Sequence, residues 1–464
     1  MLDAETRGEN WLTSGGNWGP VCHGGMAIGA LAIAEREPAL ARRIVKRCLL
    51  GVRYAAANYA PAGAHSEGPG YWAYGTNFYF LLTDALKTTL GTTCGLEKAP
   101  GILQTGDYNL QMTTPTGQMY SYCDSVAAFG FEPVMFWFAR ELKQYDLAST
   151  TLERLDEMKQ ILVSDAAQPD ASRLQTVALI WWDPALLPAA DQVIGPLNWW
   201  SGGGPEPQAV MRSAWGGPKA AYVGLKAGKA EESHGHMDAD SFIYEVNGVR
   251  WAVDLGRNDY DAPRRHGLGS DLFRADQDSK RWAIFRNGAE SHNIIRFNGG
   301  APWVEGMTEI QPAKNPVIGS AYTMDLTPAY TGQADTLRRG ICLRPDRTLL
   351  VRDEWQVGNH AALVTWQWLT FAKAEVTQEG PTLTQNGETL YLRATASSAT
   401  HFAVEALPRS ASAWDTPNPG LVRLTIRLST PAHQQGWLTV MAGSAGELKT
   451  ALTGKLPTLP LAEW

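Results

Sequence analysis

Cysteine is scarce in this sequence: its 464 residues include five cysteines, and none of them forms a CxxC pair. An odd and scattered set of this kind argues against a disulfide framework. Long apolar runs are also missing, since none approaches the roughly 18 residues of a membrane span. The net charge of −7 lacks the basic footprint of nucleic-acid-binding proteins. We therefore expect an ordinary globular protein with no membrane span and no nucleic-acid partner.

A signal peptide is not visible either. Residues 1–16 contain no basic region followed by an apolar one. Two interpretations follow: a cytoplasmic protein, or a sequence that begins after a leader.

The length exceeds what one hydrophobic core usually supports, so two domains are expected. In the first part, apolar residues recur at helical spacing, for example at Ile44, Cys48 and Val52. Successive helices joined by loops rich in glycine and proline are typical of bundles and α/α toroids. The predicted helices cover residues 22–35, 38–58, 74–90, 127–142, 147–163 and 174–182.

A stretch rich in proline and glycine, residues 187–207, marks the predicted domain boundary. Beyond it the apolar residues alternate with polar ones in short runs separated by turns, the pattern of an antiparallel β-sandwich. The predicted fold is α then β: a partial α/α toroid over 1–190, a linker over 191–207 and an antiparallel β-sandwich over 208–464.

Two of the nine histidines, His234 and His236, precede a predicted hairpin with Asn247-Gly248 at its tip. On a strand, residues i and i+2 project from the same face, so both imidazoles are expected to address one site. Imidazole binds metals and transfers protons near neutral pH. The pair by itself fits two surface histidines in front of a hairpin equally well.

Two segments carry a resemblance to a known family. Residues 233–256 (SHGHMDADSFIYEVNGVRWAVDLG) and 285–299 (FRNGAESHNIIRFNG) resemble the heparinase II/III-like family of polysaccharide lyases. In the helical half, residues 17–33, 67–78 and 115–125 are similar to segments of that family. The resemblance covers most of the chain and implies an α/α toroid followed by a β-sandwich, the order that the periodicity indicates independently.

The resemblance also implies a metal site. His236, Asp254 and His292 match residues that bind a structural zinc ion in relatives. Two imidazoles and a carboxylate are normal zinc ligands, with water in the fourth position. The alternatives are a strand-end cap for Asp254 and a hydrogen-bonded core histidine for His292.

The implied reaction is β-elimination on a uronic acid. Its carboxylate must be neutralised, a base must remove the neighbouring carbon-bound proton, and an acid must protonate the leaving oxygen. By resemblance, Tyr74 is the catalytic tyrosine and Tyr71 its rival; an aromatic packing role is the alternative. His234 would assist from the second domain, and Asn17 would hydrogen-bond the uronate carboxylate.

One position departs from part of the family. Several relatives have a histidine base after the asparagine, whereas Trp18 follows Asn17 here. His23 is either its replacement or a helix residue with no catalytic role; in the second case Tyr74 serves as both base and acid. Substrate contacts are expected from Glu67, Tyr71, Tyr260 and Arg286. For the two charged residues, Glu67 and Arg286, a solvated surface position is the alternative.

The leading hypothesis is a zinc-containing lyase that cleaves an anionic uronate polysaccharide or oligosaccharide, such as a glycosaminoglycan, an alginate or a bacterial exopolysaccharide. The alternatives are a zinc-dependent glycan hydrolase and a non-catalytic carbohydrate-binding protein on the same fold. Lyases for exogenous polymers usually act outside the cytoplasm, so a periplasmic or secreted location is expected. An incomplete toroid would expose apolar surface, which favours a homo-oligomer.

Overall fold

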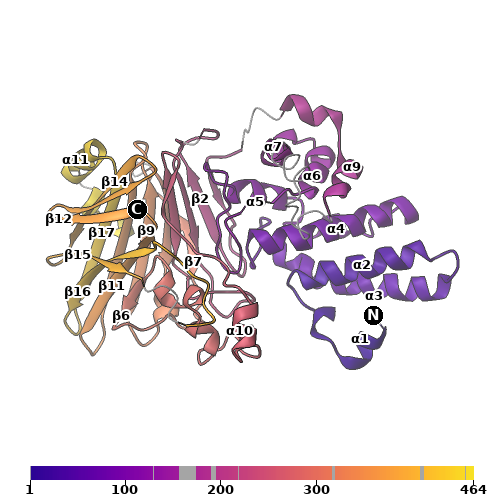
Figure 1. The fold of residues 1–464 in the computed structure, drawn as a ribbon, viewed down its shortest axis with the longest axis horizontal. Coiled ribbons are helices and arrows are strands. Elements are labelled where there is room, and N and C mark those ends of the chain that lie inside the picture. Colours follow the sequence, from indigo (N-terminus) through magenta and orange to yellow (C-terminus); the bar gives the residue numbers. More distant parts are fainter. Residues whose placement is uncertain are drawn as a thin grey trace. The chain divides into compact units, whose positions relative to one another are not determined.

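Helices occupy the first part of the chain and antiparallel strands the remainder in the computed structural model of the protein (Figure 1). This order confirms the predicted α-then-β fold class. The structure describes residues 2–128, 130–155, 174–189, 195–217, 219–315, 319–407, 412–454 and 456–464. Two compact units form, one from Met1–Thr113 with Ala128–Gly195 and one from Thr114–Ala127 with Pro196–Trp464. Residues 114–127 thus belong to the strand-rich unit although helices flank them in the sequence.

The first unit is built around α2 (Trp18–Ala32), α3 (Pro38–Ala56) and α4 (Pro69–Leu90), with α2 packed against the other two. Both α3 and α4 begin with proline, whose missing N–H has no helical partner to lose in a first turn. The remaining described α-helices of this unit are α1 (Leu2–Arg7), α5 (Thr105–Met112), α6 (Val134–Leu142), α7 (Ser149–Glu153) and α9 (Ala178–Trp181). The helix predicted over 147–163 lies partly outside the described residues.

The described residues of the second unit form three antiparallel sheets, with strand orders β1-β2-β3-β4-β5, β12-β13-β14-β17-β10-β9-β8-β7 and β15-β16-β11-β6. The strands of the first sheet are β1 (Asn198–Trp200), β2 (Gln208–Arg212), β3 (Tyr222–Lys226), β4 (Phe242–Val246) and β5 (Val249–Ala252). Those of the second are β7 (Glu309–Pro312), β8 (Ser320–Asp325), β9 (Thr336–Leu343), β10 (Leu349–Gln356), β12 (Lys373–Thr377), β13 (Gly380–Gln385), β14 (Glu388–Ala396) and β17 (Gln435–Gly443). Those of the third are β6 (Ile295–Phe297), β11 (Ala362–Thr370), β15 (Phe402–Ala406) and β16 (Val422–Thr430).

One hydrophobic core joins these sheets. It buries side chains from all three, among them Phe242 of β4, Leu438 of β17 and Trp366 of β11. Trp72, Trp181, Trp251, Trp366 and Trp368 are among the largest fully buried side chains of the protein. Many of the tryptophans therefore fill cores.

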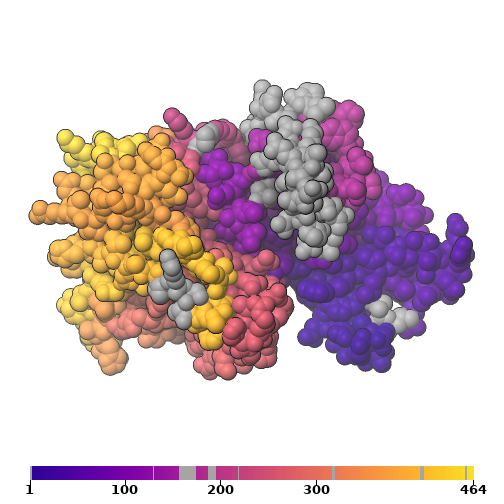
Figure 2. Space-filling model, viewed as in Figure 1, coloured from indigo at the N-terminus to yellow at the C-terminus, as the bar shows by residue number. Residues whose placement is uncertain are grey.

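The β4–β5 hairpin confirms its predicted turn. Asn247 and Gly248 have φ values of 57° and 77°, the left-handed pair that a tight hairpin of this kind requires. Among the described residues of this unit, the α-helices are α10 (Asp261–Arg265) after β5 and α11 (Ala445–Thr453) after β17. The segments coloured orange and yellow in Figure 2 form much of this unit's visible surface. Among the described helices, none combines the length and apolar character that a membrane crossing requires.

Candidate active site and metal centre

The two histidines of the motif lie in a loop that precedes β4. The prediction that they lie on a strand is wrong, because His234 has a φ of 61°, which breaks extended geometry. Both imidazoles still address one group, the carboxylate of Asp124. The side chain of His236 is completely buried and that of His234 is 9% exposed.

Asp124 is the centre of a buried hydrogen-bond network. Its Oδ2 lies 2.7 Å from Nδ1 of His234, 2.7 Å from the hydroxyl of Tyr260 and 3.2 Å from Nη2 of Arg281. Its Oδ1 lies 3.0 Å from Nε2 of His236. Burial opposes ionisation, but the Arg281 charge and the two imidazole hydrogen bonds hold the pKa of Asp124 well below its ordinary value. An ionised carboxylate therefore anchors both rings.

A set of buried donor atoms without hydrogen bonds adjoins this network. Asp238, Asp254 and His292 bring potential ligand atoms within 4.8 Å of one another. Oδ2 of each aspartate, Nε2 of His292 and Nδ1 of His236 have no hydrogen-bond partner. Nδ1 of His292 makes a longer contact of 3.4 Å with Oδ2 of Asp254. Since buried polar atoms are rarely left unsatisfied, this donor set fits a bound cation.

Of the predicted ligands, His292 lies beside both Asp254 and His236, and Asp238 groups with Asp254 and His292. The imidazole centroids of His236 and His292 are 5.5 Å apart. Asp238 forms the tighter group with Asp254 and His292. Its other oxygen, Oδ1, accepts a hydrogen bond from buried Lys226 at 2.7 Å. Two imidazoles and two carboxylates are a normal ligand set for zinc.

In the first unit the structure brings Asn17 and Glu67 together. The backbone N–H and the Nδ2 of Asn17 both donate to Oε2 of Glu67, at 2.9 and 2.7 Å. Both side chains are almost completely buried, so Glu67 is not a solvated loop carboxylate. Tyr71 and Tyr74 lie half-buried in the first part of α4. The Tyr74 ring packs edge-on against Phe78, with centroids 5.7 Å apart.

His23 is a packing residue of the helical unit. It is completely buried in α2, and its Nε2 lies 3.3 Å from the carbonyl oxygen of Leu12. A Cβ added at Gly51 of α3 would lie 2.1 Å from that nitrogen, so the helices close tightly around the ring. Burial lowers the pKa of His23 to about 4. This environment favours the helix residue without a catalytic role over the replacement base.

Tyr260 and Arg286 have different environments in the second unit. Tyr260 donates its hydroxyl to Asp124 and so belongs to the histidine network. The guanidinium of Arg286 donates to the side chain of Asn418 and to the carbonyl oxygens of Leu255 and Arg257. These bonds make Arg286 a brace between chain segments. The arginine that faces the motif is Arg281, which also donates to the carbonyl oxygen of Gly235.

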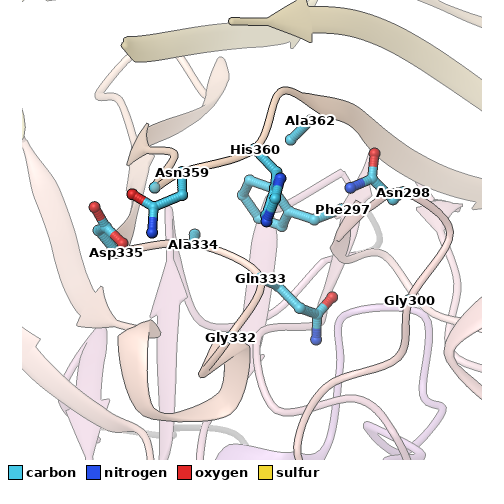
Figure 3. A pocket seen from close by; sticks show the side chains of 11 residues that line it. Phe297, Asn298, Gly300, Gly332, Gln333, Ala334, Asp335, Asn359, His360 and Ala362 are labelled. Atoms are coloured by element: carbon cyan, nitrogen blue, oxygen red, sulfur yellow. The ribbon is translucent and has the colours of Figure 1, made fainter. Parts of the chain in front are cut away.

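A cavity of about 580 Å³ lies elsewhere in the strand-rich unit. In Figure 3, Asp335 and Asn359 lie on one side of it and Asn298 on the other, with His360 between them. None of the predicted site residues lines this cavity. We therefore assign it no part in the chemistry of the histidine motif.

Comparison with known proteins gives a structural answer only. No protein-family model matches the sequence, and no curated protein matches it. Among solved structures, heparinase III superposes with a TM-score of 0.64 at 12% sequence identity, over 90% of this chain and 61% of that one. The chain has a heparinase III-like fold. The resemblance noted in the sequence is confirmed at the level of the fold.

Other structures with the heparinase III-like fold agree. The heparan sulfate lyase HepC from Pedobacter heparinus gives a TM-score of 0.62 at 12% identity, over 90% of this chain and 58% of that one. A second heparinase III gives 0.59 at 14% identity, with the same two coverages of 90% and 58%. The chain thus spans about three fifths of the length of these structures.

Sequence reasoning missed three residues of the site: Asp124, Asp238 and Arg281. Asp124 lies in residues 115–125, a segment similar to the family, but it is 110 positions from His234 and nothing in the pattern pairs them. Asp238 follows His236 by two residues, and that spacing was an available signal. Arg281 lies in a run of mixed charges where burial alone distinguishes it.

Proposed function

We propose that the protein is a polysaccharide lyase that cleaves a uronate-containing polysaccharide by β-elimination. The observation that carries this proposal is the heparinase III-like fold, which the chain shares over nine tenths of its length with a heparinase III and a heparan sulfate lyase. Heparan sulfate is accordingly the first substrate to test. The site chemistry adds support, because a histidine and a tyrosine hydroxyl meet on one ionised aspartate.

Each step of the reaction has a candidate group. Asn17, held by Glu67, hydrogen-bonds the uronate carboxylate and so favours the enolate that forms when the proton leaves. Tyr74 removes that proton and returns one to the leaving oxygen, since His23 is buried among helices and Trp18 has no basic nitrogen. His234 assists in neutralising the carboxylate or in proton transfer, with Tyr260 beside it.

Zinc is the cofactor in this proposal. Asp238, Asp254 and His292 would hold it together with His236, because these side chains present the unsatisfied buried atoms. A bound zinc ion would link the histidine motif to the segments after β5 and before β6, a structural contribution. The elimination itself is assigned to Asn17, Tyr74 and His234.

The test is the ultraviolet absorbance of the unsaturated uronate that elimination creates. Purified protein is incubated with heparan sulfate, heparin, hyaluronan, chondroitin, alginate and a bacterial exopolysaccharide. Tyr74→Phe removes the proposed base, and Tyr54→Phe is the matched control, since Tyr54 is an exposed residue of α3. We expect absorbance to rise on at least one substrate, to be lost in Tyr74→Phe and to persist in Tyr54→Phe.

Other outcomes would reject the proposal. New reducing ends without absorbance, lost when the metal is removed, would identify a zinc-dependent hydrolase. Substrate binding without any product, unchanged in Tyr74→Phe, would identify a carbohydrate-binding protein.

A periplasmic or secreted location and a homo-oligomeric state complete the proposal. Cell fractionation tests the first and light scattering of the purified protein tests the second. A cytoplasmic protein or a monomer would reject the corresponding part.

A further inference from the structure

The two oxygens of Asp124 serve the two histidines of the motif separately. Oδ2 faces Nδ1 of His234 at 2.7 Å, and Oδ1 faces Nε2 of His236 at 3.0 Å. The same carboxylate therefore contacts Nδ1 of one imidazole and Nε2 of the other, although the two histidines are only two residues apart in the sequence. The side chain of Asp124 is 1% exposed, which leaves these bonds shielded from water.

The other donors around the Asp124 carboxylate show which atom donates and which accepts in its hydrogen bonds to the histidines. The guanidinium of Arg281 has only donors, and its Nη2 donates to Oδ2. The hydroxyl of Tyr260 donates to the same oxygen at 2.7 Å. Asp124 is therefore an acceptor throughout. Each imidazole must then place its N–H on the nitrogen that faces Asp124, which is Nδ1 in His234 and Nε2 in His236.

A neutral imidazole with one N–H has its lone pair on the other nitrogen. In His236 that nitrogen is Nδ1, which is buried and has no hydrogen-bond partner. Atoms of Asp238, Asp254 and His292 that also lack partners lie in a group of potential ligands within 4.8 Å of one another, and the His236 ring lies 5.5 Å from the His292 ring, measured between centroids. In His234 the lone pair falls on Nε2, the nitrogen that points away from the carboxylate.

Hydrogen bonds to the backbone hold the loop that carries Asp124 against the segment that carries Asp254. The hydroxyl of Ser121 donates to the carbonyl oxygen of Asp254 at 3.1 Å, and the N–H of Arg257 donates to the carbonyl oxygen of Ser125 at 2.8 Å. Cys123, directly before Asp124, has a φ of 53°, a strained value that such bonds must maintain. The loop with Asp124 is thus fastened to the segment that carries Asp254.

We propose that Asp124 is a positioning residue that sets the tautomers of both histidines, so that His236 binds the metal through Nδ1 and His234 retains Nε2 as the proton acceptor. The statement about His236 stands on the geometry of the metal centre. The statement about His234 rests on the proposed lyase function. Carboxylates that orient a metal-binding imidazole in this way are a general feature of metal sites.

Nuclear magnetic resonance tests the assignment directly. The full-length protein, labelled with a nitrogen isotope in its histidines, is loaded with an NMR-active cadmium isotope in place of zinc. We expect scalar coupling between cadmium and Nδ1 of His236, a proton on Nε2 of His236 and a proton on Nδ1 of His234. Cadmium coupling to Nε2 of His236, or no coupling to this residue, would overturn the proposal.

Substitutions separate the two oxygens of Asp124. Asp124→Asn places an amide N–H against the rings and should weaken cadmium binding by about 10- to 100-fold in chelator competition. Tyr260→Phe removes a donor from Oδ2 alone and should leave cadmium affinity unchanged while lowering lyase activity. Asp346→Asn is the matched control, because Asp346 pairs with Arg344 in the β9–β10 turn.

The outcomes distinguish this proposal from the lyase function. Coupling to Nδ1 of His236 with no product on any polysaccharide would retain the tautomer assignment and reject the lyase. Asp124→Asn binding cadmium as tightly as the unmodified protein would reject the assignment even if elimination is observed. If Asp124→Asn does not fold, the coupling pattern of the unmodified protein decides.

Discussion

The ammonium group of Lys226 lies 2.7 Å from Oδ1 of Asp238, and both side chains are completely buried. Lys226 also pairs with Glu206 at 2.6 Å, so one cation serves two buried carboxylates. Because Oδ1 of Asp238 is engaged in this way, Oδ2 is the oxygen left for the metal centre. The ion pair therefore orients a candidate ligand that the sequence did not reveal.

Replacing Lys226 by methionine should strongly destabilise the second unit. The substitution keeps most of the side-chain volume but leaves two carboxylates without their buried cation. Breaking a buried pair by removing one partner typically costs about 3–5 kcal/mol in the free energy of unfolding. Urea denaturation of the two proteins measures the difference.

Lys229→Met is the control for this prediction. Lys229 pairs with Glu231 in a partly exposed position, with 30% and 42% of the two side chains accessible. An ion pair of that kind contributes about 0–1 kcal/mol. Equal losses of unfolding free energy in the two variants would show that the effect of Lys226→Met does not come from the buried ion-pair network.

Gly256 keeps the Asp124 loop against the segment after β5. A Cβ at this position would lie 2.1 Å from the carbonyl oxygen of Ser125, and its φ is 59°. Gly256→Ala should destabilise the unit by roughly 1–3 kcal/mol or more and weaken metal binding, because it separates Asp124 from Asp254. Thermal denaturation and chelator competition measure the two effects.

Gly267→Ala provides a matched comparison. Gly267 has a similarly positive φ of 81°, but an added Cβ would meet nothing within 4 Å. This variant carries the backbone cost without the clash, so its metal affinity should not change. A loss of metal affinity in both variants would mean that backbone strain, and not displacement of the loop, is responsible.

Asn17 should matter for turnover more than for stability. Its Nδ2 is oriented by Glu67, and it is the proposed donor to the uronate carboxylate. Asn17→Ala should lower kcat by about 100-fold, the usual cost of losing a donor to a developing oxyanion. Glu67→Gln should lower kcat by about tenfold, since it weakens a charge-assisted bond that positions the amide.

Steady-state kinetics on the substrate found in the absorbance test measure both values. Glu97→Gln, in a turn after α4, removes a carboxylate of the same unit and should leave kcat unchanged. If Asn17→Ala raises KM alone, Asn17 binds the substrate without favouring the enolate.

The fold was accessible from the sequence because its signals are local. The change in hydrophobic period near residues 187–207 separates helices from strands, although β1 (Asn198–Trp200) lies inside the predicted linker of 191–207. Asn247-Gly248 specifies the hairpin tip. The site was less accessible because its contacts are not local. Asp124 and His234 are 110 positions apart in the sequence. His23 is buried, and no pattern in the residues around it indicates this burial.

The burial of His23 also predicts how stability depends on pH. Its pKa is lowered from 6.5 to about 4, mainly because the helices exclude water from the ring. Above pH 6.5 the ring is neutral in the folded and unfolded states, so it adds no pH dependence. As the pH falls from 6.5 toward 4, the His23 ring binds a proton in the unfolded chain but not in the folded protein, so the free energy of unfolding decreases.

His23→Gln should remove this component of acid destabilisation. The pKa shift corresponds to a loss of up to about 3 kcal/mol in the free energy of unfolding. As the pH falls, the stability of the variant relative to the unmodified protein should therefore rise by about that amount. Urea denaturation at neutral pH and near the lowered pKa measures the change, with His360→Gln at an exposed position as the control. If His23→Gln instead abolishes turnover at neutral pH with no change in this pH dependence, His23 acts on the substrate and its assignment to packing is wrong.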